Sequence, residues 1–272
     1  MNWRAIRALA ARDLTVVRRS RAMLAPLILV PVIVSVVMPA LVALVPRFAG
    51  QAPGGVGNGA ALLGNLPPAM RQALAGYTPE QAMLVLLAVY SLAPLFLLLP
   101  FMIANVIAAD SIAGERERKT LEALLYSPVT DGELFMAKTL AAWVPALFAT
   151  LGSFLVYAVV LNAAAWPTMG RVFFPNAMWV VLVLWVSPAV AGVGLGAMVL
   201  VSSRVRAVQE AIQLSGLLVL PLVVVVVLQV RGSMMLGTRA VALAGVVVWA
   251  VAAAILAYGA RTFRRVNLIA KL

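Results

Sequence analysis

The chain of 272 residues contains no cysteine and no histidine. The absence of cysteine excludes disulfides and thiolate chemistry, and the absence of histidine excludes imidazole metal ligands and Ser–His catalytic pairs. Ser187 and Ser215 therefore have no visible base, and no pair of acids lies inside an apolar run. These absences disfavour an intramembrane enzyme, and we expect the chain itself to carry no catalytic residue and no metal site.

Charged residues are also scarce. They make up 11% of the chain, and hydrophobic residues make up 64%, whereas an average soluble domain is about 25% charged. The mean hydropathy is +1.05. This composition predicts an integral membrane protein of the all-α class.

Apolar runs of about 20 residues, the length needed to cross a bilayer, occur six times. The expected spans are 22–45, 82–109, 139–161, 177–201, 211–230 and 240–260. We expect them to form a single transmembrane domain over residues 22–272. Within the fourth span, Gly192 and Gly196 lie four residues apart, a spacing typical of close helix packing.

Basic residues are distributed unevenly between the two sides that six spans would define. Sixteen of the 21 Lys and Arg residues precede the first span, follow the last, or lie in the second or fourth connection. Since cytoplasmic segments of membrane proteins are enriched in Lys and Arg, both termini are expected in the cytoplasm. The net charge of +12 then reflects topology and contact with anionic lipid rather than nucleic acid.

Residues 1–21 predict an amphipathic helix that lies on the inner face of the membrane. Its apolar side on a helical wheel includes Trp3, Ile6, Leu9, Leu14 and Val17. Its other side carries Arg4, Arg7, Arg12, Arg18 and Arg19, whose head groups would face lipid phosphate. The alternative is that these arginines act only as a topology signal.

The one long block of mixed charge covers residues 110–134. Glu115 with Lys119, and Arg118 with Glu122, are spaced for pairing along a helix. Pro128 ends this helix, and Thr130 with Glu133 predicts a capping box that starts the next; the same motif begins the second span at Thr78. Between Asp110 and Glu122 the block has four acids and three bases. Near-neutral mixed charge favours contact with a protein surface, and a solvated helix that touches nothing is the alternative.

Residues 114–141 read GERERKTLEALLYSPVTDGELFMAKTLA, which resembles the first cytoplasmic loop of ABC type-2 exporter permeases. The residues that fit the pattern are Glu115, Glu117, Thr120, Leu121, Glu122, Leu124, Leu125, Pro128 and Lys138. Lys119 and Ala137 depart from it, because each stands where the family usually has glycine. Residues 12–33 are similar to the start of the sodium- and drug-efflux branch of these permeases.

The resemblance implies a permease that pairs with itself or a homologous permease and with two cytoplasmic ATPase subunits, which bind ATP and Mg²⁺. It implies a cytoplasmic membrane, bacterial or archaeal, and a path lined by the second and fifth spans. Ser91 and Asn105 are candidates for that path because, 14 residues apart, they share a face of an ideal helix. The implied coupling helix includes Glu115, Arg116, Glu117, Arg118, Lys119, Thr120, Leu121, Glu122, Leu124 and Leu125.

The ATPase has to be another chain. A P-loop needs Gly-Lys-Ser/Thr after a glycine-rich turn, and none of the three lysines, Lys119, Lys138 and Lys271, follows glycine. Two other functions stay open. One is an ATPase-driven subunit that transmits mechanical work without moving a solute. The other, an ion-coupled secondary transporter, is disfavoured because the expected spans contain no charged side chain to couple ions.

Overall fold

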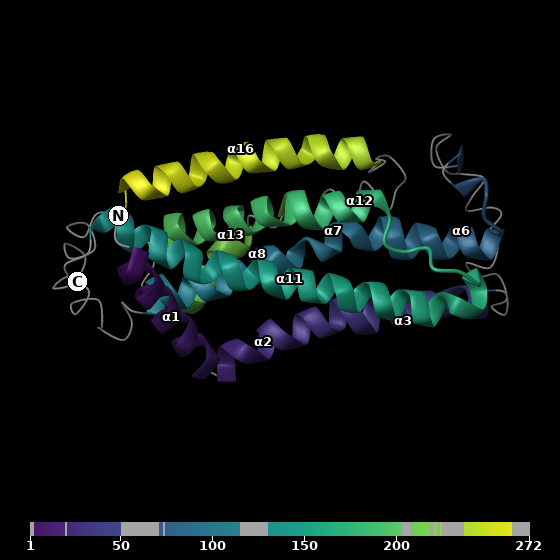
Figure 1. Ribbon diagram of the computed structural model, residues 1–272, viewed down its shortest axis with the longest axis horizontal. Helices are drawn as coiled ribbons and strands as arrows, with labels where there is room; N and C mark the ends of the chain where they lie inside the picture. Colours follow the sequence, from purple (N-terminus) through teal and green to yellow (C-terminus); the bar gives the residue numbers. More distant parts are fainter. Residues whose placement is uncertain are drawn as a thin grey trace.

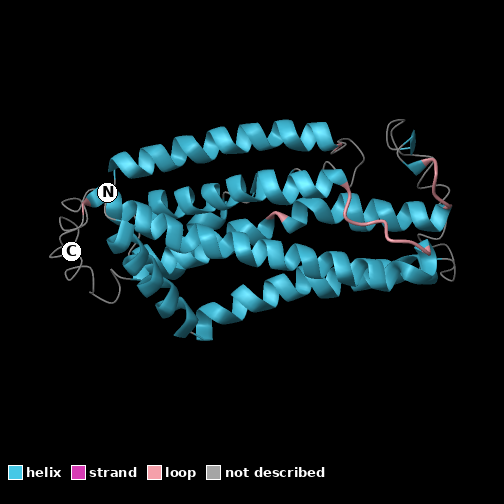
Figure 2. Ribbon diagram, viewed as in Figure 1, coloured by secondary structure: helices cyan, strands magenta, loops and turns pink. Residues whose placement is uncertain are grey.

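The computed structural model describes residues 3–19, 21–49, 71–72, 74–114, 130–202, 208–217, 220–221, 224 and 237–262. These residues form a bundle of long helices that run roughly side by side, with no strand among them (Figures 1 and 2). The expectation of an all-α membrane protein is confirmed for this part of the chain.

The helices follow the expected spans in order. The helix α1 (Trp3–Arg19) precedes the spans. The first span is formed by α2 (Arg21–Val32), the π-helical turn η1 (Ile33–Val37) and α3 (Met38–Ala49). The second span is formed by α6 (Pro79–Val85), η2 (Leu86–Ser91), α7 (Leu92–Phe96) and α8 (Leu98–Ala109), followed by η3 (Asp110–Gly114). The remaining elements are α11 (Asp131–Met169), α12 (Ala177–Val181), η4 (Leu182–Val186), α13 (Ser187–Ser202), α14 (Val208–Gly216) and α16 (Thr238–Thr262).

Five of these helical stretches are long and apolar enough to cross a membrane. They are Leu24–Val45, Pro79–Ala109, Asp131–Met169, Ala177–Val201 and Thr238–Arg261. They correspond to the first four expected spans and the sixth, and the fourth has the expected bounds. Most of the expected fifth span, 211–230, lies outside the described residues, so a count of six stays a prediction.

The third of these helices, α11, is much longer than the expected span 139–161. Its 39 residues extend about 58 Å at 1.5 Å per residue, against about 30 Å of hydrocarbon. It starts early because Thr130 and Glu133 form the predicted capping box, and it ends at Gly170, whose φ of 61° closes the helix in the left-handed region. The capping box at Thr78 and Gln81 is also present.

In three spans a π-helical turn lies just before a proline. Pro39, Pro94 and Pro188 each lie two or three residues after η1, η2 or η4. A proline ring collides with the carbonyl four residues earlier and has no N–H to offer, and a wider turn relieves that collision. Serine hydroxyls bond across two of the turns: Ser91 Oγ donates to Leu86 O at 3.1 Å, and Ser187 Oγ donates to Leu182 O at 3.2 Å.

The second span is also interrupted between α7 and α8, where a short turn replaces the helix in the middle of the bundle (Figure 2). Leu97 lies in this turn, and its N–H bonds only three residues back, to Pro94 O at 3.2 Å. Pro94 and Pro100 flank the turn, and neither can donate a backbone hydrogen bond. The second span is therefore two helical halves joined at Leu97.

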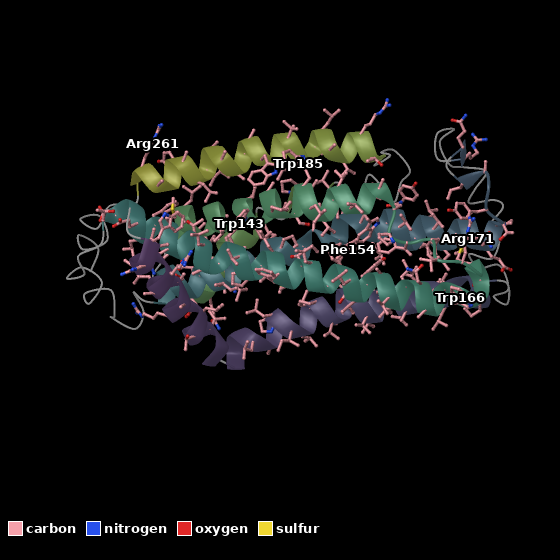
Figure 3. All side chains as sticks on the ribbon, viewed as in Figure 1. Trp143, Phe154, Trp166, Arg171, Trp185 and Arg261 are labelled. Atoms are coloured by element: carbon pink, nitrogen blue, oxygen red, sulfur yellow. The ribbon has the colours of Figure 1, made fainter. Side chains whose placement is uncertain are left out.

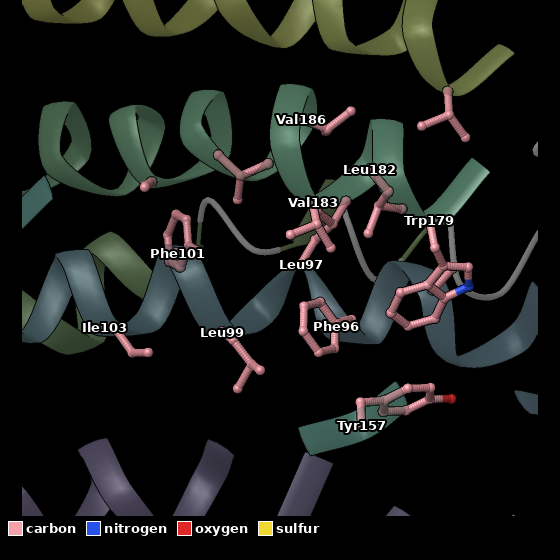
Figure 4. Packing of buried hydrophobic residues seen from close by; sticks show 14 of the residues in the cluster. Phe96, Leu97, Leu99, Phe101, Ile103, Tyr157, Trp179, Leu182, Val183 and Val186 are labelled. Atoms are coloured by element: carbon pink, nitrogen blue, oxygen red, sulfur yellow. The ribbon is translucent and has the colours of Figure 1, made fainter. Parts of the chain in front are cut away.

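Aromatic side chains from other spans satisfy carbonyls of the first half. Tyr157 of α11 donates to Ala88 O at 2.6 Å, and Trp179 of α12 donates to Val89 O at 2.8 Å. The two rings stack, with centroids 4.9 Å apart, and Phe96 packs edge-on against both (Figure 4). Both donors come from outside the second span, so these two bonds tie its first half to α11 and α12.

The α13 helix lies between α8 on one side and α16 on the other. The glycines of its GVGLG run make this possible. An added Cβ at Gly194 would lie 2.8 Å from Phe101 O of α8, and one at Gly192 would lie 3.3 Å from Ala252 Cβ of α16. Gly196 is pressed against Ile255 of α16. The predicted packing role of Gly192 and Gly196 is confirmed, and Gly194 has the same role on the opposite face.

We therefore expect Gly194→Ala to destabilise the protein by about 1–3 kcal/mol, the usual cost of overpacking a core. The added methyl group would meet backbone of α8, which cannot move aside as a flexible side chain can. Thermal unfolding in detergent, followed by size-exclusion recovery, measures the effect. Gly152→Ala is the matched control, because nothing lies within 4 Å of a Cβ at this exposed position of α11. Equal melting temperatures for the two variants would contradict the packing argument.

Candidate functional site

One end of the bundle, which we call the basal end, gathers the parts of the chain that the sequence predicts to face the cytoplasm. The helix α1, the end of η3, the start of α11 and the end of α16 all lie there (Figure 1). Arg261 marks this end in Figure 3, and Trp166 and Arg171 mark the opposite end. The fold thus places the described ends of the chain and both flanks of the charged block on one side.

The predicted coupling residues themselves, 115–125, lie outside the described residues. Their two flanks are described. On one side the second span ends in η3, and on the other Thr130 caps α11. The coupling assignment stays a prediction, and the geometry of its two attachment points is what the structure adds.

A buried lysine joins these flanks. Lys138, on the first turns of α11, is 6% exposed, and its Nζ donates to Ser111 O and, at 3.3 Å, to Ser111 Oγ. Asp110 and Ser111 are equally buried in η3, at 2% and 4% exposure. An ammonium group taken out of water needs strong acceptors in compensation. Here the carbonyl and the hydroxyl of one residue serve as two of them.

The helix α1 packs against α11 at the same end. Ile6 and Val17 of its predicted apolar side are buried, at 1% and 3% exposure, and Leu9 packs beside Leu134 and Phe135. The protein therefore covers part of the side that we expected to lie in lipid. Trp3 is 51% exposed, so this residue is free to reach the membrane interface.

Three of the arginines on the other side of α1 are described. Arg4, Arg7 and Arg12 are exposed. Arg18 and Arg19 belong to α1, but their side chains lie outside the described part. The segregation of charge that the sequence predicted is thus present in the three arginines that are described.

A second polar contact links the second span to the beginning of the expected fifth. Asn105 Nδ2 of α8 donates to Ser215 Oγ of α14 at 2.7 Å, and Ser215 Oγ donates in turn to Ile212 O at 3.0 Å. Both side chains are buried, and Asn105 Oδ1 has no hydrogen-bond partner. Among the described residues, no three acidic side chains gather as a metal site would require.

Ser91 does not share this environment. It is partly exposed, and its hydroxyl bonds within its own helix, to Leu86 O. The 14-residue spacing of Ser91 and Asn105 implies one face only if the helix is continuous, and the turn at Leu97 interrupts it. The role of either residue in a transport path stays a prediction.

Sequence reasoning missed two of these polar groups. Ser111 and Ser215 were not candidates for the site, because a lone serine in an apolar run carries no signal of its partner. Lys138 appeared only as a match to the family pattern. Its position eight residues after Thr130, on a helix that soon becomes apolar, could have indicated that its charge turns inward to the bundle.

A family model described as ABC-2 family transporter protein matches residues 7–259. The match covers most of the chain, so the protein belongs to the ABC-2 family and is a membrane permease subunit of an ABC transporter. It is a multi-pass membrane protein of the transport machinery rather than the catalytic subunit. None of the curated proteins matches the chain.

The contact between the second and fifth spans can be tested by removing the hydroxyl. Ser215→Ala leaves the buried amide of Asn105 without its acceptor, which typically costs about 1–3 kcal/mol. We expect a lower melting temperature in detergent. In a double-mutant cycle with Asn105→Ala, the stability lost by the double mutant should be less than the sum of the losses of the two single mutants. Thr15→Ala is a control on exposed α1, where the hydroxyl bonds only its own helix at Ala11 O. Additive losses would show that the two side chains do not interact.

Proposed function

We propose that this chain is the membrane-spanning half of an ATP-driven exporter. Two copies, or one copy and a homologous permease, would assemble with two cytoplasmic ATPase subunits, which bind ATP and Mg²⁺. The family match over residues 7–259 carries the proposal. The sequence supports the need for a separate ATPase, because no lysine of this chain follows a glycine as a P-loop requires.

The charged block is the proposed contact with the ATPase. Glu115, Glu117, Arg118 and Glu122 would make the polar contacts, and the leucines at 121, 124 and 125 would enter a groove of the partner. Two observations support this. The block has mixed, nearly balanced charge, which suits a protein surface. Its two flanks are joined where Lys138 of α11 donates to Ser111 of η3, and α1 packs against α11 at this end (Figure 1).

The transport cycle follows from where those flanks lead. Closure of the ATPases would displace the block and, through it, the basal ends of the second and third spans. Rigid-body shifts of such helices would change the access of a central path from one side to the other. A path beside α8 and α14 would be mostly apolar, with Asn105 as a polar group. That lining favours an apolar or amphipathic substrate.

The membrane setting follows from charge. The basal end would face the cytoplasm of a bacterial or archaeal cell, since most Lys and Arg lie in segments that lead from that end. Arg4, Arg7 and Arg12 of α1 are exposed there, and each would contribute about 1 kcal/mol through anionic lipid. Lipid phosphate is thus a proposed partner of α1.

A charge-reversal variant tests the coupling contact. Glu115→Lys/Glu117→Lys would oppose like charges to a basic patch of the ATPase, at a cost of several kcal/mol if the contact is close. We expect the variant to insert in the membrane and to lose co-purification with the ATPase, or to keep it and lose coupled hydrolysis. Pull-down and ATPase activity of the purified complex measure both.

Glu80→Lys is the matched control for that variant, because Glu80 is an exposed acid at the start of α6, at the opposite end. It should bind and hydrolyse as the parent complex does. If Glu115→Lys/Glu117→Lys also behaves as the parent, the block is a solvated loop and not the coupling contact. Substrate transport into vesicles by the parent complex would separate export from transmission of mechanical work alone.

Topology is testable because the native chain has no cysteine. We expect Arg171→Cys, at the exposed opposite end, to react with a membrane-impermeant maleimide in intact cells. Lys119→Cys and Arg261→Cys should react only after the cells are opened. Reaction of Lys119→Cys in intact cells would reverse the proposed orientation.

A further inference from the structure

The hydrogen bond of Lys138 closes the base of the charged block. Ser111 and Lys138 are 27 residues apart in sequence, and all of 115–129 lies between them. Both side chains are buried, so water does not compete for this contact. The last turn of the second span and the first turns of the third are therefore joined directly, in addition to their connection through the block.

The location of the lysine suits its charge. Ser111 lies in η3, the last described turn of the second span, and both its carbonyl and its hydroxyl accept from Lys138 Nζ. Carbonyl and hydroxyl oxygens carry partial negative charge and accept hydrogen bonds from an ammonium group. A lysine is long enough to reach from α11 into this end while its aliphatic stem stays among apolar side chains. The contact is thus favoured by the backbone of η3 as well as by the hydroxyl of Ser111.

The elements on both sides of Lys138 have further contacts that fix their positions. The capping box of Thr130 and Glu133 sets the start of α11, only eight residues from Lys138. On the other side, α8 packs against both α11 and α13. A displacement that reaches either flank therefore meets a junction whose two sides are bonded to each other, rather than two helices that can slide independently.

We propose that Lys138 is a positioning residue that makes α8 and α11 move as one unit when the charged block is displaced. This inference rests on the proposed function, since it assumes that an ATPase displaces the block. Lys138 does not touch ATP or the ATPase in this account. It holds the two spans together so that a displacement is passed into the bundle instead of being absorbed between η3 and α11.

The experiment follows the basal end in the purified complex of the chain with its co-expressed ATPase, in lipid nanodiscs. Spin labels are placed at Gly132→Cys and Arg261→Cys. Both positions lie at the basal end, and nothing lies within 4 Å of a Cβ at Gly132. The distance between the labels is measured without nucleotide and with ATP and vanadate, and ATP hydrolysis is measured in parallel.

With Lys138 intact we expect a distance change on trapping. Lys138→Met should keep co-purification and hydrolysis but reduce that change at least twofold, because part of the displacement is then absorbed between η3 and α11. Lys138→Arg, which keeps a cationic donor, should restore most of it. Arg171→Met, which removes a positive charge at the opposite end, should leave it unchanged. If Lys138→Met does not yield folded protein, Lys138→Leu, which also has no donor, replaces it and should show the same loss.

Three results would overturn the inference. One is a full distance change in Lys138→Met or in Lys138→Leu. The second is the same reduction in Lys138→Met and Lys138→Arg, which would indicate a packing role without the donor. The third is a parent complex that shows no co-purification or no distance change. In that case the proposed function itself fails, and the inference fails with it.

Discussion

Backbone carbonyls of the second span accept hydrogen bonds from side chains of other spans, and in a bilayer, where no water can serve as a donor, the bundle depends on such bonds. The indole of Trp179 in the fourth span donates to Val89 O of the second span. Tyr157 does the same for Ala88 O. Each of these two hydrogen bonds requires a large side chain at one depth and in one orientation. The second, third and fourth spans are therefore held in register by hydrogen bonds, whereas lipid on every side would give apolar packing little advantage over separation.

Hydrogen bonds between spans also hold the basal half of the second span, where the donors are an ammonium group and an amide instead of aromatic side chains. The ammonium group of Lys138 donates to Ser111 O of η3, and the amide of Asn105 donates to Ser215 Oγ of α14. One half of the second span is thus tied to α11 and α12, and the other half to α11 and α14. The interruption at Leu97 lies between the two. A span divided in this way, with each half fixed to different neighbours, is suited to changes in which the halves shift relative to one another.

Much of the fold could be predicted because its signals are local. The spans follow from runs of apolar residues, and the start of α11 follows from Thr130 and Glu133, which meet within one turn. The spacing of Gly192 and Gly196 predicted a packed face, and the structure identifies Ala252 and Ile255 as what they pack against. The family follows from the charged motif, whose residues are adjacent in sequence. Its proposed contact with an ATPase concerns a surface of another chain, which neither the motif nor this fold contains.

The sequence by itself determined the all-α class, the two helix starts set by capping boxes, and the family, because each depends on residues within a few turns of one another. Only the tertiary structure decided which prolines follow a π-helical turn and that the helix carrying Ser91 and Asn105 is interrupted. It alone also decided that buried Lys138 donates to Ser111. These features join positions tens of residues apart. A hydroxyl, an indole or an ammonium names the bond it can make, but its partner is known only when the packing of the spans brings the two groups together.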